Sequence, residues 1–374
     1  MEQVHFRYWL ANLMNIGIKK IDILLDLYGS AEEVFKASKE ELYALKRDGS
    51  FAGLMSEKDL ETICSNRDRS KITACYNDLI SSGVTFISKE DADYPDKLRN
   101  IYSAPYALYL KGRLPRKENK VIAVIGAREC SPYGMEMTKY LAGAIAAQGI
   151  HIISGLARGV DAYAHQGALF AGGVTYAVMG CGIDICYPRE NINLYMDMQR
   201  EGGIISEYAP NIKPFAGNFP MRNRIISGLS DGIVIIEAKE KSGSLITVDY
   251  GLDQGKDIYA LPGRATDRLS EGCNNLIKLG AKMVTSPKDI LEDLLPGGYG
   301  IDSKERNIAL TDQHSNTVYS CLDSDPKHIE EIAQLAGLPV QLIMEQLLLL
   351  ELQGLIHQTM KNFYCKTIIG MIEV

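Results

Sequence analysis

Two short loops that pair a glycine with an arginine are the residues of this sequence best suited to bind phosphate. One apolar run ends at Gly126 and is followed by Arg128, and a second ends at Gly155 and is followed by Arg158. Glycine at the end of a buried strand lets backbone N–H groups and a helix N-terminus approach an anion, and arginine adds forked donors for phosphate oxygens. Because the loops follow successive strands, the sequence predicts a double-loop phosphate site.

A third cationic segment, Arg222-Asn-Arg224, stands at a predicted helix start. Two arginines around an amide donor suit phosphate oxygens. In the alternative interpretation, one arginine pairs with Glu207 or Asp231 and is structural. We expect at least one of the two to contact phosphate.

Two further loops carry groups that can contact nucleic acid. Ser242-Gly-Ser244 precedes an apolar helix, where it can be an ordinary N-cap and can also offer hydroxyl and N–H groups to an anion. Phe215 and Phe219 flank a turn-rich loop beside Lys213. Loop aromatics beside cations suit base stacking on single strands, although burial of either ring is an equally good interpretation.

No catalytic motif accompanies these loops. Asp161 and His165 lie four residues apart on one helix face, but a neutral histidine packed against the aspartate of its own helix is the commoner arrangement. The segment Gly155-Leu-Ala-Arg-Gly159 has neither the glycine spacing of dinucleotide-binding folds nor the Gly-Lys-Ser/Thr of a P-loop. The eight cysteines form no Cys-x-x-Cys pair and are expected to be reduced core thiols. We therefore expect no catalytic residue, no cofactor and no metal.

A parallel sheet is the element that would hold the loops together. Apolar strands alternate with helix-length segments, which is the pattern of a doubly wound α/β sheet. The predicted strands are Val121–Ile125, Ile150–Ser154, Val174–Met179, Ile204–Glu207, Gly232–Glu237, Ile258–Leu261 and Lys282–Thr285.

The rest of the chain predicts further units around this sheet. In order, these are an all-helical domain of the SAM or helix-hairpin-helix type (1–70), a lead-in segment that docks on the sheet (71–120), the extended Rossmann-like domain (121–295), a linker (296–306) and a winged-helix domain (307–374). The helical hairpin at 14–20 contains one glycine, so a structural role is favoured over phosphate binding.

Charge and hydropathy limit the classes of partner. A formal net charge of −7 argues against coating of nucleic acid by bulk positive charge, so an anion site must be local. The third winged-helix helix, Val340–Gln353, has no lysine or arginine, so we interpret this domain as a protein-contact or packing module, with Lys361 and Lys366 in the wing leaving a DNA contact open. The most apolar segment, Leu342–Ile356, is interrupted by glutamates and glutamines, and no membrane span or signal peptide is expected.

Taken together, the loops resemble the motif series of the DNA-processing protein A (DprA/Smf) family. The matching segments are Gly126–Arg128, Ser154–Asp161, Gly182–Pro188, Phe219–Gly228, Ser242–Thr247 and Pro262–Gly263, with Asp93–Pro95 and Tyr109–Gly112 in the lead-in. The resemblance implies an extended Rossmann fold and a homodimer without catalytic turnover. It further implies a bacterial cytoplasmic protein that binds single-stranded DNA and loads the RecA recombinase onto it, notably in natural transformation.

Loop chemistry and the resemblance together predict a single-stranded DNA site with little sequence preference and strong salt dependence. Its expected residues are Gly126, Ala127, Arg128, Ser154, Gly155, Arg158, Gly159, Lys213, Phe215, Phe219, Arg222, Asn223, Arg224, Ser242, Gly243 and Ser244. The chain departs from the family pattern at Ala127 (usually Ser), Asn211 (usually Gly), Tyr250-Gly251 (usually small residues) and Cys273 (usually Thr). None of these departures removes a cation.

Two other functions compete with this prediction. A phosphoribohydrolase-like enzyme acting on a nucleoside monophosphate would use the same sheet and glycine loops, and would need a cleft carboxylate such as Glu207 or Asp184. A scaffold that works through its winged helix would not depend on the cleft cations. The ordered motif series favours the single-strand binder over both.

Overall fold

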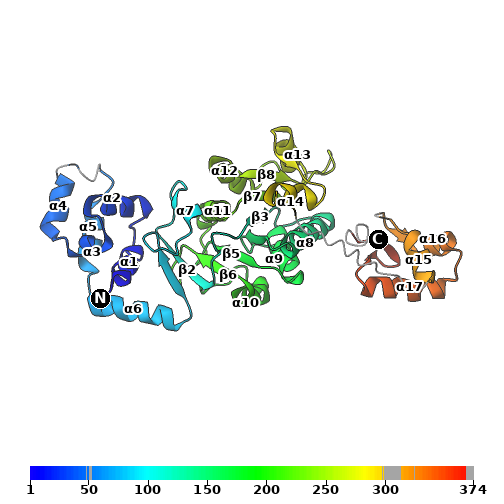
Figure 1. Ribbon diagram of the computed structural model, residues 1–374, viewed down its shortest axis with the longest axis horizontal. Coiled ribbons are helices and arrows are strands. Elements are labelled where there is room, and N and C mark those ends of the chain that lie inside the picture. The colour runs from blue at the N-terminus through cyan, green and yellow to red at the C-terminus, as the bar shows by residue number, and fades with distance from the viewer. Residues whose placement is uncertain (48, 50–52, 297, 299–312, 324, 368–374) are drawn as a thin grey trace.

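A nine-stranded sheet forms the centre of the protein (Figure 1). The computed structural model describes residues 1–47, 49, 53–296, 298, 313–323 and 325–367. The strand order is β1-β2-β6-β5-β4-β3-β7-β8-β9; β3 to β9 pair in parallel, and β1 and β2 join antiparallel at one edge. The strands are β1 (Thr85–Ser88), β2 (Ala107–Gly112), β3 (Val121–Ile125), β4 (His151–Ser154), β5 (Thr175–Met179), β6 (Gly203–Ser206), β7 (Gly232–Ile235), β8 (Asp257–Ala260) and β9 (Lys282–Met283).

The predicted α/β architecture is confirmed. The predicted strands all exist, with ends that differ by at most two residues from the observed ones, whereas β1 was not predicted. Their apolar runs are continuous because both faces of the sheet are buried. In β3, Ile122 and Val124 pack into one core and Ala123 and Ile125 into the other.

Helices cover both faces of the sheet. Side chains of α8, α9 and α14 fill the core on one face, and those of α7, α11, α12 and α13 fill the core on the other. These helices, with α10 beside β5 and β6, are α7 (Asp96–Arg99), α8 (Pro132–Ala147), α9 (Val160–Phe170), α10 (Ile192–Glu201), α11 (Asn218–Leu229), α12 (Leu245–Asp253), α13 (Glu271–Lys278) and α14 (Lys288–Leu294).

Six helices precede the sheet and pack onto its edge. Phe6, Trp9 and Phe35 form edge-to-face aromatic contacts in their centre, and the same core continues to Tyr109 of β2. These helices are α1 (Gln3–Ala11), α2 (Ile18–Tyr28), α3 (Ala31–Lys36), α4 (Lys39–Arg47), α5 (Glu57–Ser65) and α6 (Arg69–Ser81).

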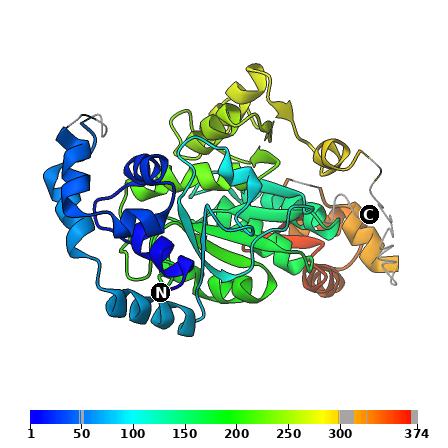
Figure 2. The same ribbon diagram turned by 60° about the vertical axis from the view of Figure 1, so that its left-hand side comes forward.

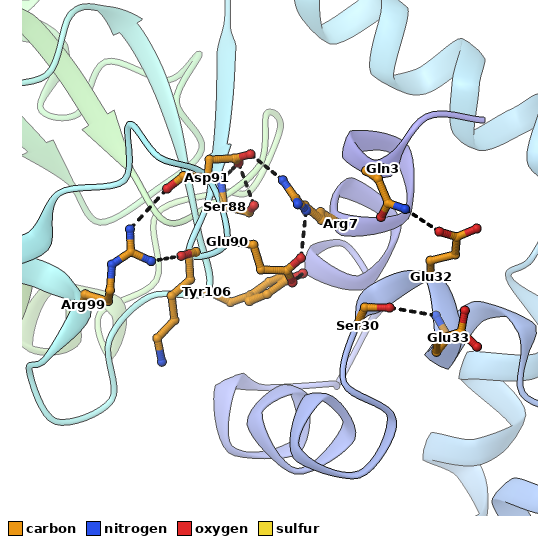
Figure 3. A network of polar contacts seen from close by, with 11 residues as sticks. Gln3, Arg7, Ser30, Glu32, Glu33, Ser88, Glu90, Asp91, Arg99 and Tyr106 are labelled. Carbon is orange, nitrogen blue, oxygen red and sulfur yellow. Dashed lines mark hydrogen bonds and ion pairs between the residues drawn. The ribbon is translucent and has the colours of Figure 1, made fainter.

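A polar network fixes these helices to the segment between β1 and β2 (Figure 3). From α1, Arg7 donates to Glu90 (Nε–Oε2 2.8 Å) and to Asp91 (Nη1–Oδ1 2.5 Å). The other oxygen of Asp91 accepts from the backbone and hydroxyl of Ser88, both at 2.7 Å. Arg99 donates to the backbone carbonyls of Lys89 and Asp91. The segment between β1 and β2 is therefore bonded to α1 on one side and to Arg99 on the other, and this fixes the position of the N-terminal helices.

A separate three-stranded sheet and three helices form the winged helix, with a core of its own. In both views the N-terminal helices and the winged helix lie at opposite ends of the molecule, with the large sheet between them (Figures 1 and 2). The elements of the winged helix are α15 (Gln313–Ser320), β10 (Lys327–His328), α16 (Ile329–Ala336), α17 (Val340–Leu352), β11 (Ile356–Met360) and β12 (Phe363–Lys366). The linker predicted at 296–306 lies, apart from residues 296 and 298, outside the described residues.

The outer face of α17 is apolar. Val340, Met344, Leu348 and Leu352 are exposed at four-residue intervals. In the described part of the chain, no single helix is long and apolar enough to cross a membrane; α16 and α17 pass by length and composition only as a pair bent by 106°.

Candidate nucleic-acid interface

A cavity of about 800 Å³ opens at the carboxyl ends of β3 and β7. At this point the strand order reverses, because β4 lies on one side of β3 and β7 on the other. Ligands of open α/β sheets bind in this crevice. Its lining includes Gly126, Ala127, Arg128, Glu129, Ala157, Asp161, Tyr187, Phe219, Arg222, Asn223, Lys239, Lys241, Ser242, Gly243 and Ser244.

The two glycine loops predicted from the sequence pack directly against each other. Gly159 has φ +70°, and a Cβ atom there would lie 2.3 Å from the carbonyl oxygen of Ala127. The N–H of Val160 donates to that same carbonyl at 3.2 Å. Because only glycine combines this backbone conformation with so close an approach, Gly159 fixes the spacing of the two loops.

Asp161 and Arg222 hold the second glycine loop from beneath. The Oδ2 atom of Asp161 accepts from the N–H groups of Gly155 (3.1 Å) and Ala157 (3.4 Å). Arg222 Nη1 donates to the carbonyls of Gly155 (2.9 Å) and Val178. Burial lowers the pKa of Arg222 to about 10, so it is cationic at neutral pH, and burial raises the pKa of Asp161. Arg222 thus lies in the cavity lining, but its Nη1 is bonded to backbone carbonyls and its Nε donates to Oδ1 of Asn223 at 3.3 Å.

Arg224 faces away from the cavity. It is 2% exposed and donates through Nη2 to both carboxylate oxygens of Glu207, at 2.7 and 2.8 Å. Asp231 instead accepts from Lys97 and from the N–H of Val121. The structural pairing considered for this arginine is therefore present, and the geometry gives its expected phosphate contact no support.

Internal carboxylates already occupy the N-terminal ends of α8 and α9. Glu237, at 3% exposure, accepts from the backbone and hydroxyl of Ser131, the N-cap of α8. Asp161 serves the start of α9. The helices α11 and α12 both begin at the cavity without an acidic residue in the first turn: Ala216 and Phe219 line it at the start of α11, and Ser242, Gly243 and Ser244 line it at the start of α12. An anion in the cavity can therefore approach either helix end, and the α12 end adds serine hydroxyl groups as donors.

Two lysines beside the start of α12 were not predicted from the sequence as site residues. Lys239 and Lys241 are exposed and line the cavity. They lie in a polar loop with no periodic pattern, where a lysine normally indicates a solvated surface. The available signal is their position, in the loop after β7 and just before Ser242-Gly-Ser244. With Arg128 they bring exposed positive charge to the cavity from two loops.

Aromatic rings form one wall. Tyr187 and Phe219 have ring centroids 5.5 Å apart, and the guanidinium carbon of Arg222 lies 6.0 Å from the Phe219 ring. Tyr187 is 46% exposed and was not selected from the sequence. Phe215, at 68%, and the exposed Lys213 lie next to lining residues without lining the cavity themselves.

The structure divides the sixteen predicted site residues. Those that line the cavity are Gly126, Ala127, Arg128, Phe219, Arg222, Asn223, Ser242, Gly243 and Ser244. Those outside the lining are Ser154, Gly155, Arg158, Gly159, Lys213, Phe215 and Arg224. Among the second group, Ser154 is fully buried and donates to the carbonyl of Val124 at 2.7 Å, so its position supports a structural role.

His165 is buried below the loops and does not pair with Asp161. Its Nδ1 lies 2.6 Å from the hydroxyl of Thr175 on β5. Burial lowers the pKa of His165 to about 3. The ring is therefore neutral, as the sequence suggested, but its partner comes from a strand rather than from its own helix.

A doubly wound sheet with glycine loops and cations at its switch point, followed by a winged helix, defines a Rossmann-like protein with a winged-helix domain. The family of "DNA recombination-mediator protein A" matches residues 85–295, and the "DprA winged helix domain" matches residues 302–359. The chain belongs to the DprA/Smf family of DNA-processing recombination mediators.

Individual relatives agree with this membership. Protein Smf of Escherichia coli (strain K12) is 38% identical over 268 residues, which cover 70% of this chain and 72% of the relative. The solved structure of DNA processing protein A from Streptococcus pneumoniae has a TM-score of 0.55 and 33% identity, and covers 75% of this chain and 99% of that one. A structure of DNA processing protein A from Helicobacter pylori, which describes its single-stranded DNA binding mode, has a TM-score of 0.52 and 29% identity over 58% of this chain and 97% of that one.

The buried His165 predicts an acid-sensitive contribution to stability. Its pKa is about 3 in the folded protein, whereas the pKa of an unfolded histidine is about 6.5. The unfolded state therefore binds more protons between these values, so the contribution is complete above about pH 6.5 and is lost as the pH falls. We expect His165→Gln to reduce the decrease in the free energy of unfolding between about pH 7 and pH 4, measured by urea denaturation. An unchanged slope in His165→Gln would contradict the prediction.

Proposed function

We propose that this protein binds single-stranded DNA in the switch-point cavity, chiefly through successive phosphates. The observation that carries the proposal is the cluster of Arg128, Lys239 and Lys241 around the open N-terminus of α12. Forked and ammonium donors together with the positive end of a helix suit phosphate oxygens. The chain as a whole has a net charge of −7, so this positive region is local.

Little sequence preference follows from this chemistry. Phosphate contacts carry no base identity, and aromatic rings stack on every base. Tyr187 is half-exposed above Phe219, where its free face can receive a base leaving the phosphate track. Phe215 and Lys213 are placed to extend the contact beyond the cavity.

The arrangement of carboxylates favours binding over hydrolysis. The acidic residues that line this cavity are Glu129 and Asp161, and Asp161 is held by two backbone N–H groups. The two candidates for a phosphoribohydrolase-like activity lie elsewhere. Glu207 pairs with Arg224, and Asp184 accepts from the N–H of Asn211 at 2.8 Å. Neither is placed to act on a nucleotide in the cavity, and we propose a binding protein rather than an enzyme.

Membership of the family supports the cellular part of the proposal. A recombination mediator must pass its DNA strand to a recombinase, and we propose RecA as the recipient, in the cytoplasm and during natural transformation. The proposal needs an open cleft from which the strand can be taken. Contacts limited to phosphates and stacked bases meet this need, because each can be exchanged singly.

We further propose a homodimer formed through the β9 edge of the sheet. Within the described sheet β9 has a single neighbour, β8. Leu279 (85% exposed), Leu252 (57%) and Met283 (52%) surround this edge. Exposed apolar side chains beside an open edge strand are typical of a surface that another chain covers.

Removing the cavity cations tests the binding site. We expect Arg128→Ala, Lys239→Ala and Lys241→Ala each to weaken binding of a labelled oligo-dT about three- to tenfold, and to lower the slope of log K against log [salt] by about 0.7 per cation. Fluorescence anisotropy over a salt series measures both. Arg200→Ala is the matched control, because it removes an exposed charge at the C-terminal end of α10, next to the start of β6 and away from the carboxyl strand ends that form the cavity.

Wild-type affinity in the folded triple variant would move the site elsewhere and favour a winged-helix scaffold. Full displacement of the oligonucleotide by a mononucleotide of equal affinity would instead favour the enzyme.

The aromatic wall is tested with Tyr187. We expect Tyr187→Ala to weaken binding of a single strand about tenfold, whereas Tyr187→Phe keeps the stacking surface and binds like the wild type. An abasic strand of the same length is the control ligand, because it offers phosphates without bases. If Tyr187→Ala weakens binding of the abasic strand equally, the ring does not act by stacking.

The β9 edge is tested by mass. We expect Leu279→Glu to convert a dimer into a monomer of 41.3 kDa in light scattering, because a buried unpaired carboxylate opposes association. Phe170→Glu is the matched control, since Phe170 is 93% exposed at the end of α9, away from β9. A wild-type monomer, or a dimer unaffected by Leu279→Glu, would refute this interface.

A further inference from the structure

Arg158 is a predicted phosphate ligand with an exposed side chain, and that side chain is already paired with an internal carboxylate. Its Nε lies 2.5 Å from Oε1 of Glu190, and its Nη2 lies 3.0 Å from Oε2. This two-pronged geometry is the one in which arginine also holds a phosphate. Glu190 therefore stands where a DNA phosphate would otherwise bind.

The protein backbone holds Glu190 in this position. Glu190 lies in a short 3₁₀ helix, Arg189–Asn191, which follows β5. Its neighbour Asn191 donates through Nδ2 to the carbonyls of Leu156 (3.0 Å) and Ala157 (3.3 Å), in the same glycine loop that carries Arg158. The carboxylate and the guanidinium are thus presented to each other by two anchored segments.

Exposure separates this carboxylate from the two that close the helix ends. Glu237 and Asp161 are 3% and 9% exposed, and their partners are backbone N–H groups and a serine hydroxyl of the core. The side chains of Glu190 and Arg158 are 51% and 63% exposed. Buried pairs of the first kind are costly to open, whereas an exposed pair contributes little and exchanges readily.

The pair lies at the rim of the cavity. Ala157, one residue before Arg158, lines the cavity, and so does Tyr187, three residues before Glu190. A strand bound at Arg128 and α12 and leaving past Tyr187 passes this pair. The Arg158 side chain lowers the pKa of Glu190, so the carboxylate is ionised at neutral pH.

We propose that Glu190 is a specificity-determining residue: it competes as an internal anion for Arg158, so that a phosphate within a bound strand displaces it and a free phosphate or mononucleotide does not. The inference rests on the proposed function of the cavity. A strand already held at Arg128 and α12 presents its next phosphate at a high effective concentration, which a separate anion in solution lacks. Glu190 then acts as a repulsive element against small cellular anions.

A double-mutant cycle tests the competition. We expect Glu190→Gln, which keeps the shape and removes the charge, to bind oligo-dT about two- to fivefold tighter than the wild type, the range expected when an exposed ion pair is removed. In Glu190→Gln, inorganic phosphate and dTMP should also displace the oligonucleotide at severalfold lower concentration. The gain should vanish in the Arg158→Ala background, where Arg158→Ala and Arg158→Ala/Glu190→Gln bind alike.

A charge control and three outcomes complete the experiment. Glu201→Gln makes the same charge change at the C-terminal end of α10, next to the start of β6 and away from the carboxyl strand ends that form the cavity, and should bind like the wild type. Glu190→Gln binding no tighter than the wild type would overturn the inference, as would an equal gain in the Arg158→Ala background. If the variants at Arg128, Lys239 and Lys241 all bind like the wild type, the proposed site itself is wrong. The two failures are therefore distinguishable.

Discussion

The guanidinium of Arg222 is the constraint on which the candidate site depends. A charge that is 4% exposed must be fully compensated, and here the compensation comes from the carbonyls of Gly155 and Val178 and from the nearby Asp161. These groups lie at the ends of β4 and β5 and at the start of α9, so one side chain from α11 fixes three elements. Removing one partner of such a buried cluster typically costs about 3–5 kcal/mol. Arg222, which the sequence predicted to contact phosphate, therefore also holds the second glycine loop in place.

A division of labour among charges follows from this arrangement. Glu237 and Asp161 accept hydrogen bonds near the starts of α8 and α9, so these buried helix ends need no bound anion. The α12 end carries serines and a glycine and is flanked by lysines, so its positive potential is available to solvent. The residues that stabilise these helix starts are thus different from Lys239 and Lys241, which are exposed in the cavity, whereas Arg222 belongs both to the cavity lining and to the supports of the fold.

The sequence predicted the sheet well because buried strands carry a strong local signal. In β3 and β7, both faces contact helices, so every residue is apolar and the ends are marked by glycine or a charged residue. The site was only partly predictable, because its partners are distant in the chain. Whether Arg224 met phosphate or Glu207 depended on a contact between α11 and the end of β6, and no local pattern distinguishes the two. Tyr187 and Glu190 follow β5, whereas Lys239 follows β7. Their proposed roles depend on the fold bringing these strand ends together, which no local sequence pattern shows.

Departures from the family pattern also have local physical explanations. Asn211 has φ +67°, in the left-handed region that glycine prefers, and asparagine is the side-chain-bearing residue that best tolerates it. Its N–H donates to Asp184, so the turn keeps its shape without glycine. Ala127 lines the cavity with a methyl group where the family usually has a hydroxyl. A methyl group offers an anion no hydrogen-bond donor, so in the proposed site Arg128 supplies the side-chain donor of the first loop.

The winged helix has no cation on the helix that would recognise DNA. Its third helix would have to carry cations to enter a DNA groove, yet α17 exposes Met344, Leu348 and Leu352 and contains no lysine or arginine. Gln341 is exposed and can donate an amide N–H, but α17 carries none of the base-contacting or phosphate-contacting cations of a recognition helix. In the proposed site the cations lie instead in the cavity of the large sheet, where they face a backbone common to every sequence. Selection by such a site depends on the number of phosphates presented in a row, and an internal anion such as Glu190 raises the number required.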